Sequence, residues 1–165
     1  MAIMRPAAVR AALIVWVCAV APFSVSAQGR FAVSADGQQV TDASNGLIWR
    51  RCAEGMKWSG GRCAGKPLKY SFTAAKATAG AASGDGKSWR VPTREELRSL
   101  VNARAKKKPK IDVEAFPNTP SQSFWAMRAG SDDNLNAWLI NFGNGKLYGN
   151  TGQAKFPLRL VRTGP

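Results

Sequence analysis

The chain has 165 residues, a formal net charge of +14 at pH 7 and no histidine. The missing histidine excludes Ser–His–Asp triads, histidine metal ligands and the most common general base. A strongly basic chain attracts polyanions through its long-range field, although charge alone says nothing about the fold.

The N-terminal residues have the features of a secretory signal peptide. Two arginines precede an apolar stretch at 11–20, and Val25-Ser26-Ala27 is a small-residue cleavage sequence. The apolar stretch is too short for a membrane-spanning helix, and no later segment qualifies. We therefore expect a signal peptide at 1–27 and one exported domain at 28–165, periplasmic or secreted. Removal of the two arginines takes the formal charge from +14 to +12.

Turn residues separate the first predicted strands. Short strands are expected at 31–34 and 40–42 around an Asp36-Gly37 turn. A stronger strand, at 47–51, follows the Asn45-Gly46 turn.

Cys52 and Cys63 are the two cysteines left after signal removal. In an exported protein, two cysteines this close predict one disulfide, worth roughly 2–4 kcal/mol. A zinc site is the poorer alternative, because no third ligand lies nearby in the sequence. The bridge would hold an irregular, glycine- and lysine-rich loop over residues 52–69.

Two short helices are predicted next. Ser71 or Thr73 can cap an alanine-rich helix that runs to about residue 82. After Trp89, the Thr93/Glu96 pair forms a capping box for a second helix, which is expected to end near residue 103. Leu97, Leu100 and Val101 give this helix one apolar stripe.

The rest of the chain is predicted to be a basic loop followed by strands. Residues 104–110 carry five positive charges in seven positions, which favours an exposed loop. Ordered coil is expected at 111–122. Strands are expected at 123–127, 137–142, 146–148 and 158–162. Two short helices packed on a small antiparallel sheet make an α+β domain.

A series of short segments follows one another in a recognisable order over residues 40–162: Val40-Thr41-Asp42, Asn45-Gly46-Leu47-Ile48-Trp49, Trp89-Arg90-Val91-Pro92-Thr93 with Glu96-Leu97 and Ser99-Leu100, Pro109-Lys110-Ile111-Asp112, Phe116-Pro117, Phe124-Trp125, Ala137-Trp138 with Phe142 and Gly145, and Leu160-Val161-Arg162. This order resembles the Lcl C-terminal domain family, a domain of unknown function named for a collagen-like adhesin.

The block from Arg90 to Glu96 and the closing strand also look like the formylglycine-generating-enzyme branch of C-type-lectin-like folds. That resemblance implies a fold in which the first and last strands pair. It does not carry over the activity, because the enzyme needs a late cysteine pair and no cysteine follows Cys63.

Two minor candidates for binding sites are weighed against plain structural roles. Asp132 and Asp133 lie in an oxygen-rich stretch that could hold calcium, but a solvated loop is the better interpretation. All five tryptophans after the signal peptide could stack on sugars. Trp49, Trp89 and Trp138 are better placed in the core, and Trp58 is the best candidate for exposed stacking.

The main candidate site is a polyanion-binding surface around the basic loop. Its proposed residues are Arg98, Arg104, Lys106, Lys107, Lys108 and Lys110, with Trp58 as a separate contact. We expect an exported, non-enzymatic binding or adhesion domain that contacts anionic polysaccharide or another acidic surface. No metal, cofactor or intracellular nucleic acid is expected, and the oligomeric state stays open. The alternative is an envelope protein–protein interaction or structural domain whose basic surface is incidental.

Overall fold

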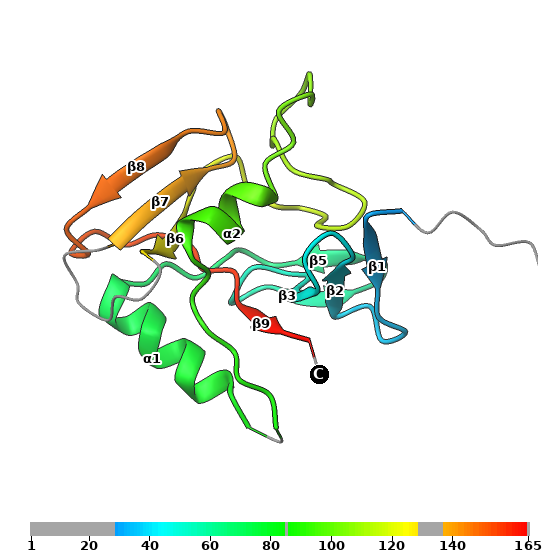
Figure 1. The fold of residues 1–165 in the computed structure, drawn as a ribbon, viewed down its shortest axis with the longest axis horizontal. Helices are drawn as coiled ribbons and strands as arrows, with labels where there is room; N and C mark the ends of the chain where they lie inside the picture. Colours follow the sequence, from blue (N-terminus) through cyan, green and yellow to red (C-terminus); the bar gives the residue numbers. More distant parts are fainter. Residues whose placement is uncertain (1–28, 85, 129–136, 165) are drawn as a thin grey trace, which may run out of the picture.

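The computed structural model describes residues 29–84, 86–128 and 137–164, so the expected signal peptide and the Asp132/Asp133 stretch lie outside it (Figure 1). A four-stranded antiparallel sheet has the order β1-β2-β3-β9, with β1 at Phe31–Val33, β2 at Gln39–Asp42, β3 at Leu47–Arg50 and β9 at Val161–Thr163. The last strand pairs with β3, where Trp49 faces Val161, and not with the first strand. The expected pairing of the first and last strands is therefore wrong.

A hairpin occupies the region that was expected to be irregular. Strands β4 (Lys57–Ser59) and β5 (Arg62–Ala64) pair across Gly60-Gly61. Cys52 and Cys63 form the predicted disulfide, which ties the end of the β3 segment to this hairpin. The loop prediction missed the hairpin but was correct about the bridge.

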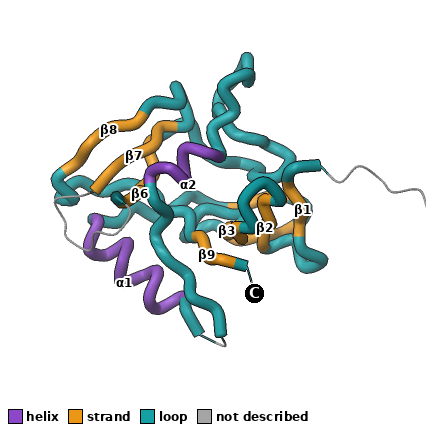
Figure 2. Tube along the Cα trace, in the orientation of Figure 1, coloured by secondary structure: helices purple, strands orange, loops and turns teal. Residues whose placement is uncertain are grey.

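The remaining strands form a second, three-stranded sheet. Strands β6 (Ser123–Met127), β7 (Ala137–Asn141) and β8 (Leu147–Asn150) run antiparallel in that order. Helix α2 (Arg94–Ser99) packs against β7 and β6, and α1 (Phe72–Ala82) lies below this sheet in Figure 1. Figure 2 shows how much of the chain between these elements is loop. The structure consists mostly of β-sheet with two short helices and is compatible with the predicted α+β class.

Strand β3 of the first sheet and strand β6 of the second sheet each lie between two apolar clusters. Leu47 and Trp49 of β3 point into the first cluster, and Ile48 points into the second. Strand β6 divides in the same way, because Phe124 joins the first cluster and Trp125 the second. Alternate side chains of a strand face opposite sides, so one strand supplies both clusters. Both sheets are thereby built into one folded body.

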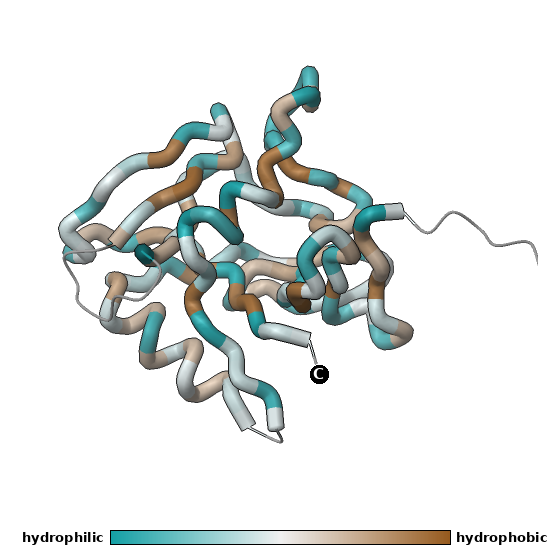
Figure 3. Tube along the Cα trace, in the orientation of Figure 1, coloured by the Kyte–Doolittle hydropathy of each residue, from teal (hydrophilic) through white to brown (hydrophobic). Residues whose placement is uncertain are grey.

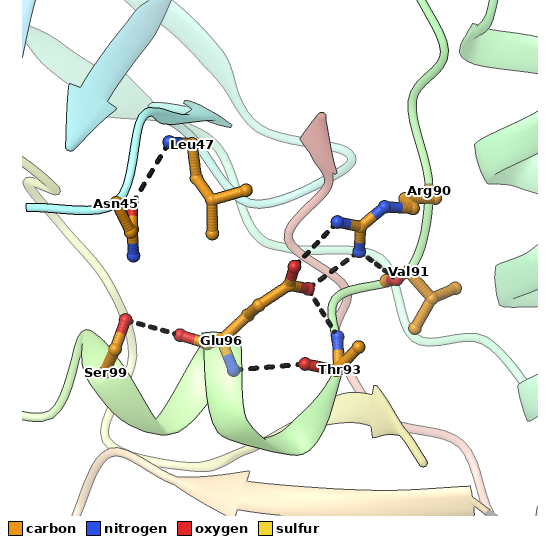
Figure 4. A network of polar contacts seen from close by, with 7 residues as sticks. All are labelled: Asn45, Leu47, Arg90, Val91, Thr93, Glu96 and Ser99. Carbon is orange, nitrogen blue, oxygen red and sulfur yellow. Dashed lines mark hydrogen bonds and ion pairs between the residues drawn. The ribbon is translucent and has the colours of Figure 1, made fainter. Parts of the chain in front are cut away.

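Figure 4 shows the capping box at the start of α2, with Arg90 beside it. Thr93 Oγ1 accepts from the Glu96 backbone amide at 3.2 Å, and the Glu96 carboxylate accepts from the Thr93 amide at 2.8 Å. Arg90 adds a bidentate pair to the same carboxylate at 2.6 and 2.7 Å. Burial opposes ionisation of Glu96, but these hydrogen bonds outweigh it and lower its pKa.

Helix α2 is shorter than predicted. It ends at Ser99, with Leu100 as its C-cap, and Val101 instead forms a bridge with Ile111. The apolar stripe survives because Leu97 and Leu100 are buried and Val101 is half-buried. No helix in the described part of the chain is long and apolar enough to cross a bilayer.

Replacing Thr93 with alanine is expected to lower the free energy of unfolding by about 0.5–2 kcal/mol, because the first turn of α2 loses its side-chain acceptor. The Thr93→Ser variant keeps the hydroxyl and is expected to cost much less. Urea unfolding of both variants measures the difference. Equal losses would show that the threonine contributes packing and not a cap.

Candidate anion-binding surface

The basic loop projects beyond α2, and its two ends are fixed. In Figure 1 the chain rises away from the body after α2 and returns, and Figure 3 colours the tip as hydrophilic. The Val101–Ile111 bridge and the hydrogen bond from the Asn102 amide to the Lys110 carbonyl close its base. The Lys110 amide then donates to the Phe142 carbonyl, which attaches the base to the residue after β7.

The predicted site residues divide into three groups. Arg104, Lys106, Lys107 and Lys108 are exposed on the loop. Lys110 is half-buried and its Nζ donates to the Ala105 carbonyl at 3.1 Å, so it braces the loop. Arg98 is exposed on α2 but borders a different hollow, with Leu147. The structure therefore brings together four of the six predicted basic residues as a free cationic surface.

Two hollows flank the loop. One, of about 590 Å³, lies between β1 and the start of the loop and includes Arg30 and Arg104 in its wall. The other, of about 570 Å³, includes Lys107 and Lys108. Both also contain Asp112 and Glu114. Asp112 accepts the amides of Glu114 and Ala115, but these donors are neutral, so the charges of both Asp112 and Glu114 oppose an incoming anion.

The tryptophans offer less stacking surface than expected. Trp49 and Trp125 are fully buried and Trp89 is 5% exposed, so none of the three presents a free ring. Trp58 is half-buried, with the Arg51 guanidinium 3.9 Å from its ring centroid. A side chain at Gly37 would begin 2.2 Å from the Trp58 indole nitrogen, so this edge is covered too. The expected free exposure of Trp58 is not found.

Among the residues that the structure describes, two charged side chains are fully buried. Asp42 accepts two hydrogen bonds from Arg30 and two from Ser44, at 2.6 to 3.0 Å. Burial opposes its ionisation, but these donors outweigh burial and lower its pKa. Arg159 donates to the carbonyls of Arg50 and Arg51 and to Thr119 Oγ1, and burial lowers its pKa to about 9, which leaves it charged at neutral pH.

The comparison with family models decides the identity. The model of the Lcl C-terminal domain matches residues 38–162, and these residues include the three-stranded sheet, the four-stranded sheet apart from β1 and the last residue of β9, the disulfide and the basic loop. The chain belongs to the Lcl C-terminal domain family. No curated protein and no solved structure gives a match, so the lectin-like part of the expected fold stays a prediction.

The Lcl C-terminal domain contains a cationic cluster that the sequence did not single out. The guanidinium carbons of Arg50 and Arg162 lie 4.8 and 5.4 Å from the Trp89 ring centroid. In the sequence these arginines looked like dispersed charge, and only the pairing of β9 with β3 brings them together. Arg50 directly follows the apolar residues Leu47, Ile48 and Trp49 of β3, and this was the one feature of the sequence that could have pointed to the cluster.

The part of this Lcl C-terminal domain that the structure describes contains no group of three Cys, Asp or Glu residues arranged to hold a metal ion. Cys52 and Cys63 are joined to each other. The calcium alternative concerned Asp132 and Asp133, which lie outside the described residues.

Proposed function

We propose that this domain is exported and binds anionic polysaccharide without catalysing a reaction. The observation that carries the proposal is the basic loop, which presents Arg104 and Lys106–Lys108 to solvent on a base fixed by hydrogen bonds. A fixed base reduces the ordering cost that binding would otherwise incur. Lysines act as point charges and do not require one ligand geometry, which suits chains of variable sulfation or carboxylation.

Export and the absence of catalysis rest on chemical arguments. A disulfide forms and persists in oxidising compartments, so the Cys52–Cys63 bridge supports export. The whole chain lacks histidine, and its two cysteines after the expected signal peptide are bonded to each other. These facts remove histidine as a general base and leave no free cysteine after the expected signal peptide to act as a nucleophile.

Replacing Lys106, Lys107 and Lys108 with alanine is expected to weaken heparin and alginate binding by roughly tenfold to a hundredfold, as the loss of three exposed cations near a polyanion implies. Each neutralised anionic group releases a counterion, by analogy with phosphate backbones. The plot of log affinity against log salt should therefore become shallower by about two to three units. Calorimetry at several salt concentrations measures both quantities.

The matched control is a triple variant that removes three exposed lysines elsewhere, Lys66, Lys69 and Lys155. It has the same net charge as the loop variant, so diffuse attraction predicts equal losses. A larger loss in the loop variant supports the loop as the site. Equal losses would favour the alternative, in which the domain serves protein interactions and its basic surface is incidental.

A further inference from the structure

A second cationic site is formed by β3, β9 and the segment before α2, far from the basic loop in sequence. Arg90 forms an antiparallel bridge with Val161, which puts Trp89 opposite Arg162. Ile48 of β3 also pairs with Arg162, and Arg50 lies on the same face two residues later. The guanidinium groups of Arg50 and Arg162 therefore project from the same face of the sheet, and both contact the indole ring of Trp89.

Neither guanidinium group forms an ion pair with a carboxylate of the described residues, although Glu54 is near enough to Arg50 for the two charges to interact. The ion pairs among the described residues involve Arg30, Arg90 and Arg94, and none involves Arg50 or Arg162. Arg162 donates to Gln39 Oε1 and to the Thr163 carbonyl. The structure shows no side-chain hydrogen bond from Arg50 to any described residue, and its buried Nε has no partner. The buried Nε is out of reach of a ligand, but the Nη groups of this half-buried guanidinium have no acceptor among the described residues and can bond one from outside.

Arg50 lies between two adjoining hollows. The first, of about 310 Å³, is lined by Arg50, Trp89, Lys87 and the side chains of Gln38 and Gln39. The second, of about 420 Å³, shares Arg50 and Gln38 and continues towards Trp58. The carboxylate in the first hollow, Asp36, already accepts from Ser34 and Gln38, and Glu54 lines the second hollow without forming an ion pair with Arg50 in the described structure.

The groups that face the first hollow match a particular ligand chemistry. A guanidinium stacked on an indole presents its N–H fork edge-on, and that fork fits a carboxylate in bidentate fashion. Lys87 adds a second charge, and Gln38 and Gln39 bring amides that can bond hydroxyl groups, Gln39 through its NH₂ group because its Oε1 accepts from Arg162. The volume is at the small end of ligand sites and suits about one sugar ring.

We propose that this hollow binds the carboxylate of a sugar acid, with Arg50 as the bidentate donor and Trp89 as its support. The choice of a sugar acid rests on the proposed polysaccharide function, but the site is separate from the basic loop. Because Arg50 opens onto both hollows, one acidic ring of a longer chain can sit at Arg50 while its neighbour occupies the second hollow.

The test is titration with sodium glucuronate, followed by ¹H–¹⁵N NMR of the Arg50 Nε–H and the Trp89 indole. We expect both signals to shift, and we expect glucose to leave them unchanged. Arg50→Gln is expected to weaken glucuronate binding by tenfold or more, as loss of charge-assisted hydrogen bonds implies. Arg50→Lys keeps the charge but not the forked pair of N–H donors, so its affinity for glucuronate should lie between that of the wild type and that of Arg50→Gln.

Two further variants distinguish a failure of the Arg50 site from unfolding of Arg50→Gln and from a failure of the basic-loop proposal. Lys87→Gln changes an exposed residue and should weaken binding by a few-fold, which keeps the test decisive if Arg50→Gln unfolds. The Lys106/Lys107/Lys108→Ala variant should bind glucuronate as the wild type does, even if it loses heparin. Glucuronate binding that survives in the folded Arg50 and Lys87 variants would overturn the proposal. Sodium acetate binding as tightly as glucuronate would overturn the assignment to a sugar acid.

Discussion

Arg159→Met is expected to lower the free energy of unfolding by about 3–5 kcal/mol. Methionine can fill much of the space but donates nothing, so the Arg50 and Arg51 carbonyls and the Thr119 hydroxyl lose their shared donor. Losing a hydrogen-bond partner inside a protein costs about 1–3 kcal/mol for each stranded group. The guanidinium also lies 4.8 Å from the Phe116 ring centroid, a contact that methionine only partly replaces.

Urea unfolding of Arg159→Met, compared with Arg159→Lys and Arg104→Met, measures this effect. Lysine keeps the charge but cannot reach acceptors on two sides, so it should retain only part of the stability. Arg104 is exposed, and its replacement should change stability by less than about 0.5 kcal/mol. A loss at Arg159 no greater than the loss at Arg104 would mean that the buried network does not stabilise the fold.

Asp42→Asn is expected to lower the free energy of unfolding by about 3 kcal/mol at neutral pH. The substitution removes the charge that Arg30 and Ser44 bind and leaves their donors facing a neutral amide. Removing one partner of a buried ion pair typically costs about 3–5 kcal/mol of stability. Because Arg30 is partly exposed, we expect a loss near the lower end of that range.

The same carboxylate gives stability a defined pH dependence. Folding lowers the pKa of Asp42 below its ordinary 3.8, so its contribution is complete above that value and is lost as pH falls through the lower, folded pKa. In chemical denaturation at a series of pH values, the wild type should therefore lose stability more steeply than Asp42→Asn below about pH 4. Parallel curves for the two proteins would contradict this assignment.

Sequence patterns predicted the local structure well where neighbouring residues determine it. Ser123–Met127 was predicted to the residue, and the Thr93/Glu96 capping box formed as its spacing required. The second helix was placed too long because Val101 fits a helical stripe as well as it fits the bridge to Ile111. The β4–β5 hairpin was missed because its strands have few of the β-branched residues that usually mark strands.

Contacts between distant segments could not be predicted in the same way. The alternating leucines and arginines at 158–162 predict a strand whose arginines face solvent. In the structure residues 158–160 precede β9, and Arg159 is buried and bonded to segments 40 to 109 residues away. Similarly, the Arg50–Trp89–Arg162 cluster exists only because β9 returns to β3. The basic loop was predicted more fully, since its charges are contiguous and its exposure follows from their repulsion.

The closed base of the basic loop also makes its tip a natural point for grafting. The Val101–Ile111 bridge and the Asn102–Lys110 hydrogen bond hold the two ends together whatever lies between them. Lengthening a loop costs little, about 0.6 kcal/mol for each doubling. A foreign peptide inserted between Lys106 and Lys107 would therefore leave both apolar clusters intact, and this scaffold could display new recognition sequences without redesign of its core.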